Sequence, residues 1–258
     1  MARRNEETLE LQACLKTLRL STITEYYQEC TAMASREELS YERFLLELVR
    51  RECEVRHKRR IDRLLRGSRL PLEKTFSLFD QKRLPARLRQ QVKTLLSGEF
   101  VARHENVLAF GNPGSGKTHL LCAIGQELIR QGHRVYFREC TLMVEDLLRA
   151  KRDLELDKLL KKLSGYDVLI LDEIGYVQNK KREEMEVLFT LLARRYERGS
   201  VMITSNLAFS KWDQIFQDPM ITAAAIDRLV HHSLILEMNL PSYRVSQAKA
   251  SKKKQTKP

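Results

Sequence analysis

The segment "GNPGSGKT", residues 111–118, matches the pattern G-x-x-x-x-G-K-[ST]. It follows the apolar run 106–110 and opens a segment rich in helix formers, which is the context this pattern requires. Glycines let the backbone turn tightly so that its N–H groups face phosphates, and the helix dipole adds positive potential there. A glycine-rich turn with an incidental lysine is the weaker alternative. The pattern predicts a nucleoside triphosphate site formed by Gly111, Asn112, Pro113, Gly114, Ser115, Gly116, Lys117 and Thr118.

Two of these side chains have individual roles in such a site. Lys117 would reach the β- and γ-phosphates, and the Thr118 hydroxyl would bind Mg²⁺. A second motif, "DVLILDE", residues 167–173, ends an apolar run in two adjacent carboxylates. Asp172 would complete the Mg²⁺ shell, and Glu173 would polarise an attacking water. Adjacent acids are also common solvated strand ends, but about sixty residues after a phosphate-binding loop they favour triphosphate hydrolysis.

Three later residues could complete the chemistry. Asn206 ends the run "SVMITSN" and could bind the γ-phosphate or the attacking water, although it could equally be a turn asparagine. Arg228 could be supplied to a neighbouring subunit to stabilise charge during phosphoryl transfer. Arg244 could sense the γ-phosphate within its own subunit. Lone arginines are more often surface residues, so both remain hypotheses at this point.

Short apolar runs rich in β-branched residues alternate with helical segments through the second part of the chain. Nearly continuous apolar strands of this kind are typical of a parallel sheet covered by helices on both faces. The fold class is therefore α/β with a parallel sheet. The expected strands are 106–110, 134–137, 167–171, 200–204 and 233–237.

The first 66 residues contain no proline or glycine and are rich in helix formers. Within them, "SYERFLLELVRR" begins a helix well because Ser40 can cap it. We expect a small all-helical N-terminal domain over 1–66 for DNA binding or oligomerisation. It is followed by a linker at 67–80 marked by Gly67 and Pro71, with another helix at 81–97. The remaining expected regions are an ATPase domain over 81–245 and a basic, disordered tail over 246–258.

The chain has 258 residues and a net charge of +12, from 46 Lys and Arg against 34 Asp and Glu. Such an excess favours a polyanionic partner because Lys and Arg displace counterions from phosphates, although it could also serve solubility alone. Five cysteines without C-x-x-C spacing argue against disulfides and zinc. No signal peptide or membrane-spanning run is evident. We expect a soluble, cytoplasmic protein with no membrane partner.

The strongest basic cluster is "RRECEVRHKRRIDRLLRGSR", residues 50–69, with nine Arg and Lys against three acids. At 100° per residue, one stripe of arginines lies opposite Ile61, Leu64 and Leu65. A guanidinium matches phosphate geometry, so this stripe predicts weakly specific, salt-sensitive binding to duplex DNA. An ordinary solvated helix face is the alternative. The predicted DNA contacts are Arg56, Arg59, Arg60 and Arg63, with a second basic group at Lys180, Lys181 and Arg182.

Several longer segments together resemble a known family. These are "GNPGSGKTHL", "LILDEIGY", "LFTLLARRYERGSVMITSNLAFSKW", "DPMITAAAIDRLVHHS" and "SYR", with looser matches in "LKTLRLSTITEYY" and "SYERFLLELVRRECEVRHKRR". They are similar to IstB-like transposition helper ATPases of insertion sequences, an AAA+ family close to DnaC-type helicase loaders and DnaA-type initiators. The resemblance covers most of the chain and is strongest over 100–245.

This resemblance implies an AAA+ fold with a five-stranded parallel core and a small helical N-terminal domain. It implies ATP-dependent homo-oligomerisation on duplex DNA, bending of that DNA and delivery of the target to a transposase, in a bacterial-type, nucleoid-associated setting. The family's motifs place Lys117 and Thr118 in Walker A, and Asp172 and Glu173 in Walker B. By the same motifs, Asn206 is sensor 1, Arg228 the arginine finger and Arg244 sensor 2.

The chain departs from the family pattern at Asn112, where proline is commoner, and in the basic run "GYVQNKKREE" after Walker B. Two alternative functions share most of the nucleotide motifs. A helicase loader or replication initiator would have the same site with a helicase as partner. A small-molecule kinase would need an acceptor pocket and a lid, and its turnover would ignore DNA.

Overall fold

The computed structural model describes residues 2–174, 182–208, 211–212 and 219–243. The chain divides into two units, residues 1–63 and 64–258, and each is considered by itself. The division falls inside helix α3, near the boundary expected at residue 66. None of the helices in the described ranges combines the length and apolarity needed to cross a membrane. The expected tail at 246–258 lies outside these ranges.

The first unit is helical, as its sequence predicts. Its helices are α1 (Ala2–Thr17), α2 (Ser21–Arg36) and the portion of α3 (Tyr41–Ser68) that ends at Arg63. The expected cap is present, because the Ser40 hydroxyl accepts a hydrogen bond from the backbone N–H of Arg43 at 3.3 Å. The buried core is small and consists of Leu15, Ile23, Cys30 and Leu48.

A buried carboxylate joins α2 to α3. Glu52 is 3% exposed, and its Oε2 accepts backbone hydrogen bonds from Thr22 (2.8 Å) and Ile23 (3.1 Å) in the first turn of α2. The Nε of Arg56 donates to the Oε1 of Glu52 at 2.6 Å. Burial raises the pKa of Glu52, but the hydrogen bonds from Arg56 and the two amides outweigh it, so the pKa lies below its ordinary value. Glu52 therefore caps α2 from a neighbouring helix.

The second unit contains a parallel sheet of five strands within the described residues, in the order β2-β3-β4-β1-β5. This confirms the expected α/β class and all five expected strands, with shifts of one or two residues at some ends. The strands are β1 (Asn106–Phe110), β2 (Val135–Glu139), β3 (Val168–Asp172), β4 (Ser200–Ser205) and β5 (Ser233–Glu237).

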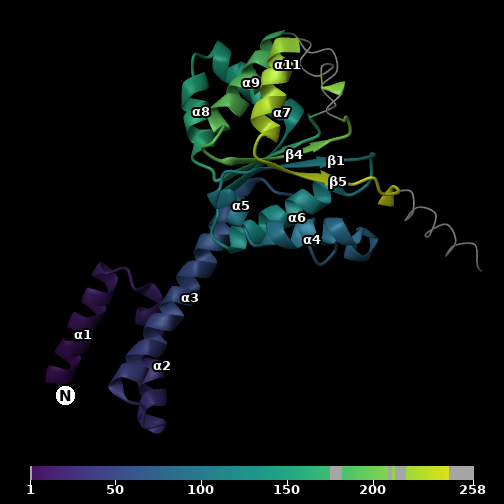
Figure 1. The fold of residues 1–258 in the computed structure, drawn as a ribbon. Coiled ribbons are helices and arrows are strands. Elements are labelled where there is room, and N and C mark those ends of the chain that lie inside the picture. Colours follow the sequence, from purple (N-terminus) through teal and green to yellow (C-terminus); the bar gives the residue numbers. More distant parts are fainter. Residues whose placement is uncertain (1, 175–181, 209–210, 213–218, 244–258) are drawn as a thin grey trace, which may run out of the picture. The chain divides into compact units, whose positions relative to one another are not determined.

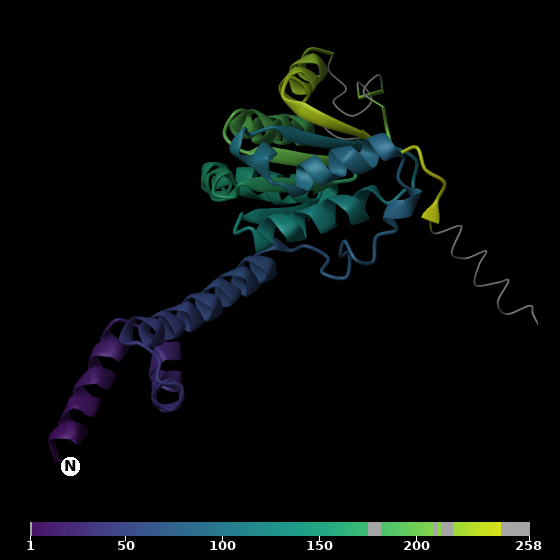
Figure 2. The same ribbon diagram turned by 60° about the horizontal axis from the view of Figure 1, so that its bottom comes forward.

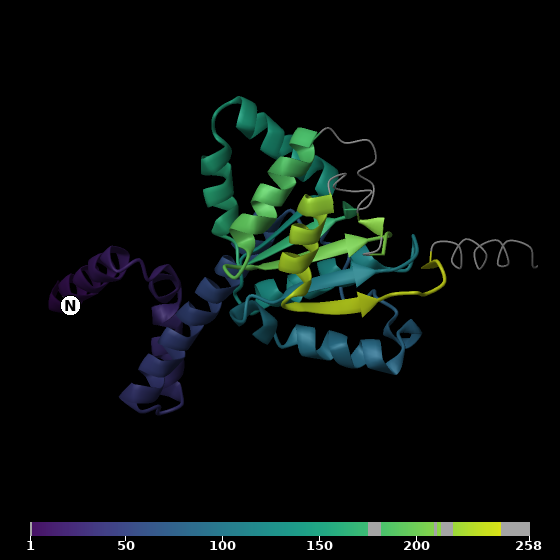
Figure 3. The ribbon, with the colours of Figure 1, turned by 45° about the horizontal axis from the view of Figure 1, so that its top comes forward.

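Helices cover both faces of this sheet, as Figures 1 and 3 show. Their burial explains why the strands read as continuous apolar runs, since all five residues of β3 are buried. The helices on one face are α4 (Ala86–Leu96), α5 (Glu99–Ala102) and α6 (Lys117–Arg130), and α4 lies beside α6 (Figure 2). Those on the other face are α7 (Cys140–Arg152), α8 (Leu156–Ser164), α9 (Arg182–Arg195) and α11 (Pro219–Val230).

The continuous helix expected over 81–97 is wrong in its first part. Residues Gln81–Arg83 form the short 3₁₀ helix η1, and α4 begins only at Ala86. Pro85 stands between them with φ −55° and ψ 153°, an extended conformation. Proline has no N–H to donate and its ring clashes with a preceding helical turn, so a helix begins after it more easily than it continues through it.

A buried arginine fixes the start of β3 against the start of β4. Arg195 is 2% exposed, and its Nη1 donates to the carbonyls of Leu163 (3.2 Å) and Tyr166 (2.6 Å). Its Nη2 donates to the carbonyls of Asp167 and Ser200, both at 2.9 Å. Burial lowers the pKa of Arg195 to about 10, against the attraction of Asp167, so the group is still charged at neutral pH. The two strands are thereby held in register.

We predict that Arg195→Met lowers the free energy of unfolding of the second unit by about 3 kcal/mol, because four buried carbonyls lose a charged donor. Arg194→Met, at the exposed neighbouring position, should change that free energy by less than about 0.5 kcal/mol. Urea unfolding followed by circular dichroism measures both. Equal midpoints for the two variants would contradict the role assigned to Arg195.

Candidate functional site

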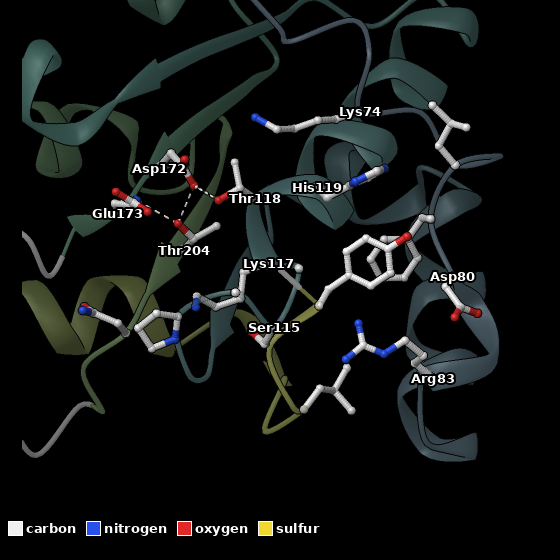
Figure 4. A pocket seen from close by; sticks show the side chains of 18 of the residues that line it. Lys74, Asp80, Arg83, Ser115, Lys117, Thr118, His119, Asp172, Glu173 and Thr204 are labelled. Atoms are coloured by element: carbon white, nitrogen blue, oxygen red, sulfur yellow. Dashed lines mark hydrogen bonds between the residues drawn. The ribbon is translucent and has the colours of Figure 1, made fainter. Parts of the chain in front are cut away.

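A cavity of about 430 Å³ lies where β1, β3 and β4 end. These strands are neighbours in the sheet, so the loops that follow them meet at one edge. The loop after β1, residues 111–116, turns directly into α6 and lines the cavity together with residues that follow β3 and β4. Figure 4 shows the side chains that face this space.

The loop glycines are required where the backbone passes close to the C-terminal segment. Gly114 has φ 79°, and a Cβ on it would lie 2.2 Å from the Oγ of Ser242. Gly111 has φ 151°, and a Cβ there would lie 2.2 Å from the carbonyl oxygen of Met238. The loop is also tied to this segment by a backbone hydrogen bond from Tyr243 to Gly114 (2.9 Å). A tight turn therefore forms at the residues predicted to bind phosphate.

The predicted lysine lies across this loop. Lys117 is 8% exposed, and its Nζ donates to the carbonyls of Gly111 (2.8 Å) and Asn112 (3.0 Å). This position places the ammonium at the turn beside which a phosphate would lie. The Ser115 hydroxyl is buried with no hydrogen-bond partner in the described part of the chain. Polar groups of this kind fit a bound anion.

One carboxylate connects three elements of the site. The Oδ1 of Asp172, at the end of β3, accepts hydrogen bonds from the hydroxyls of Thr118 on α6 (2.8 Å) and Thr204 on β4 (2.6 Å). Thr204 in turn accepts the backbone N–H of Glu173 at 2.7 Å. Figure 4 shows this chain of bonds. Carboxylate and hydroxyl oxygens are ligands that Mg²⁺ prefers, and Mg²⁺ commonly uses one carboxylate plus substrate phosphates, so Thr118 and Asp172 fit that ion.

The backbone turns sharply after Asp172. Glu173 has φ 60°, in the left-handed region that a non-glycine residue enters at some energetic cost, and such residues are frequent at active sites. Its side chain is exposed and lines the cavity. Asn206, after β4, also lines the cavity, and its Oδ1 is buried without a hydrogen-bond partner among the described residues. An acid and an amide therefore line the cavity together with Thr118 and Asp172.

A wall of the cavity comes from the segment expected to be a linker. Lys74, Phe79 and Asp80 line the cavity, and so does Arg83, which follows them in η1. The Arg83 guanidinium donates to the carbonyl of Pro241 and lies 5.2 Å from the centre of the Tyr243 ring. The run "TFSLFD", 75–80, carries the only available sequence signal, because three large apolar residues are unusual in a solvated linker.

Arg228 lies away from this cavity. It is on the last turn of α11 and lines a separate hollow with Asn106, the first residue of β1, whereas the phosphate-binding loop follows the last residue of β1. At about 3.3 Å per residue, these two ends of the strand are roughly 13 Å apart. The guanidinium lies 4.7 Å from the centre of the Phe189 ring, and its Nη1 is buried without a hydrogen-bond partner among the described residues.

The remaining predicted residues are divided between the first unit and the edge of the described ranges. In the first unit, the Nη2 of Arg56 donates to the carbonyl of Arg19, and Arg59 donates to the Ser21 hydroxyl at 3.1 Å. These two arginines therefore have structural partners, and all four arginines of the stripe are exposed. Arg182 begins α9 and pairs with Glu186 at 3.3 Å. The predicted residues Arg244, Lys180 and Lys181 lie outside the described residues.

Known proteins share both the sequence and the fold. The family model described as IstB-like ATP binding protein matches residues 13–251. An insertion sequence ATP-binding protein of Sinorhizobium fredii is 42% identical over 95% of this chain and 82% of its own length. An IS21 counterpart from Pseudomonas aeruginosa is 39% identical over 92% of this chain and 89% of its own length.

Solved structures of replication ATPases share the fold at low identity. DnaA from Aquifex aeolicus bound to AMPPCP has a TM-score of 0.55 and 19% identity, covering 72% of this chain and 57% of that one. DnaI has a TM-score of 0.55 and 21% identity, covering 66% of this chain and 95% of that one. The second unit thus has the AAA+ fold. With the family match over nearly the whole chain, the protein belongs to the family of IstB-like ATP-binding proteins.

Proposed function

We propose that this protein is an ATPase that uses ATP to control its own assembly on duplex DNA, and that it bends this DNA and recruits a transposase. The observation that carries the proposal is the separation of Arg228 from Glu173 and Asp172 within one chain. If a neighbouring subunit must supply Arg228 to complete the ATPase site, hydrolysis can occur only in the assembly. The insertion sequence relatives support the transposition context.

The hydrolytic step needs a water held in line with the γ-phosphate and a base to polarise it. Glu173 supplies the carboxylate, and Asn206 supplies an amide whose oxygen has no hydrogen-bond partner among the described residues. Thr204 fixes the backbone of Glu173 through its 2.7 Å hydrogen bond, so the acid's position follows that of Asp172. Mg²⁺, held by Thr118 and Asp172, would neutralise charge on the phosphates.

Arg228 would act on the nucleotide of an adjacent copy. A phosphoryl-transfer site gains about 10³–10⁵ in rate from such an arginine. The half-buried guanidinium is oriented by the Phe189 ring and keeps a polar atom without a partner in the described residues, as expected for a side chain awaiting a ligand from outside the chain. Stacked copies of this chain would therefore hydrolyse ATP, and isolated copies would only bind it.

DNA would be held through phosphate contacts of α3. All four arginines of the stripe are exposed, and Arg56 is in addition the partner of buried Glu52. Contacts of this type carry little sequence information and weaken as salt rises. The transposase would be recruited by the DNA-bound assembly. A helicase as partner is the alternative that the nucleotide motifs leave open, and affinity capture with a transposase against a helicase separates the two.

We predict that Glu173→Gln lowers the ATPase rate by about 10²–10⁴, the range for a general base, while ATP affinity changes little. The DNA-bound assembly should then dissociate far more slowly. Steady-state phosphate release and dissociation of labelled duplex DNA measure these effects. Glu145→Gln, at an exposed acid on α7, is the matched control. A normal ATPase rate in Glu173→Gln would show that Glu173 is not the base for hydrolysis.

Arg228→Ala should lower the ATPase rate by about 10³ or more, with ATP still bound by each chain. Mixing this variant with Glu173→Gln provides the sharper experiment. An intact Glu173 then meets an intact Arg228 from the other chain, so the mixture should regain activity that neither variant has alone. An absence of recovery, in mixtures shown by light scattering to co-assemble, would mean that Arg228 does not act in trans.

Arg60→Gln together with Arg63→Gln should flatten the salt dependence of duplex DNA binding by a slope of about 2, because each lost phosphate contact removes about 0.9. Fluorescence anisotropy between low and moderate salt measures the slope. The control pair is Arg149→Gln with Arg152→Gln, exposed residues of α7 that remove the same charge. Equal slopes for the two pairs would place the DNA contacts elsewhere.

A further inference from the structure

Residues 71–75, called the strap below, are held by hydrogen bonds to helix α6, which follows the phosphate-binding loop. Gln126, a 3% exposed residue of α6, donates from Nε2 to the carbonyls of Pro71 (3.2 Å), Leu72 (3.4 Å) and Lys74 (3.2 Å). His119, directly after Thr118, is hydrogen-bonded through Nε2 to the carbonyl of Thr75 at 2.8 Å. These bonds flank Lys74, so its backbone is fixed relative to the helix that presents Lys117 and Thr118.

The side chain of Lys74 extends from this strap into the nucleotide cavity (Figure 4). Burial raises the pKa of the Cys122 thiol to about 12, while the charge of Lys74 lowers it and that of Asp172 raises it. Among the described residues, no carboxylate forms an ion pair with Lys74 within 4.0 Å.

The Lys74 ammonium is one of few positive charges among the acidic side chains that line the cavity. The carboxylates of Asp80, Glu139, Asp172 and Glu173 line the cavity together with the cations Lys74, Arg83 and Lys117. The guanidinium of Arg83 is already engaged by the Pro241 carbonyl and the Tyr243 ring. A triphosphate with one Mg²⁺ brings further negative charge into this space, and charge in a partly enclosed site must be neutralised by nearby groups.

We propose that Lys74 is a second phosphate-binding lysine of this site, acting beside Lys117. It donates a charge-assisted hydrogen bond to a phosphate oxygen from the side of the strap, and Gln126 and His119 hold it in place for that contact. The proposal rests on nucleotide binding alone, and neither DNA, assembly nor a transposase enters it. An ammonium that contacts only water in this position is the competing role.

Lys74→Met should weaken ATP binding about 10–100-fold, the effect of losing a charge-assisted hydrogen bond. The affinity of Lys74→Met for ADP should fall no further than its affinity for ATP, and its affinity for adenosine should be unchanged. Lys74→Arg should retain most of the ATP affinity. The matched control is Lys82→Met, since Lys82 is exposed on η1 and does not line the cavity. Competition against a fluorescent ATP analogue, without DNA and with Mg²⁺, measures each affinity for the full chain.

Three results would overturn the proposal. Unchanged ATP affinity in Lys74→Met would leave Lys74 as a solvated residue. Equal losses for ATP and adenosine, or a thermal unfolding midpoint lowered in Lys74→Met but not in Lys82→Met, would make it a packing residue of the wall. ATP binding by the wild-type chain is measured in the same assay, so failure of the DNA and transposase functions would leave this test unaffected.

Discussion

The shared hydrogen bonds of the Asp172 carboxylate are the constraint on which the nucleotide site depends. One oxygen accepts both the Thr118 hydroxyl from the phosphate-binding helix and the Thr204 hydroxyl from the adjacent strand. These donors come from residues far apart in the chain, so the bonds form only when β3, β4 and α6 are correctly placed. A buried carboxylate needs such partners, and the requirement ties the proposed Mg²⁺ ligands to the fold.

The same constraint sets the position of the proposed base. Because Thr204 accepts the N–H of Glu173 while donating to Asp172, the left-handed turn at Glu173 has a fixed anchor. At the other end of the same two strands, Arg195 bonds the carbonyls of Asp167 and Ser200. A one-residue slip of β3 against β4 would break bonds at both ends, and it would also turn every side chain of a strand to the other face. Register and chemistry are therefore stabilised together.

Much of the fold could be predicted from the sequence because the signals are local. The strands are continuous apolar runs, and the phosphate-binding loop is a contiguous pattern between a strand and a helix. The wall formed by Lys74 and Phe79 could not be predicted in this way, because it depends on hydrogen bonds from Gln126 and His119 to the carbonyls of Lys74 and Thr75, over separations of 52 and 44 residues. Likewise, periodicity places Arg56 on the arginine stripe but does not show that it pairs with a buried glutamate.

That pairing gives one arginine of the stripe a structural role in the first unit. Arg56 stabilises the carboxylate that caps α2. Because removing one partner of a buried charge is strongly destabilising, Arg56 is needed for the stability of the first unit whether or not it contacts DNA. Arg59 is similarly directed toward the start of α2. All four arginines of the stripe are nevertheless exposed, so a structural contact does not withdraw an arginine from a phosphate. Substituting Arg56 would perturb the fold together with any DNA contact, and only the contacts in the structure reveal this double role.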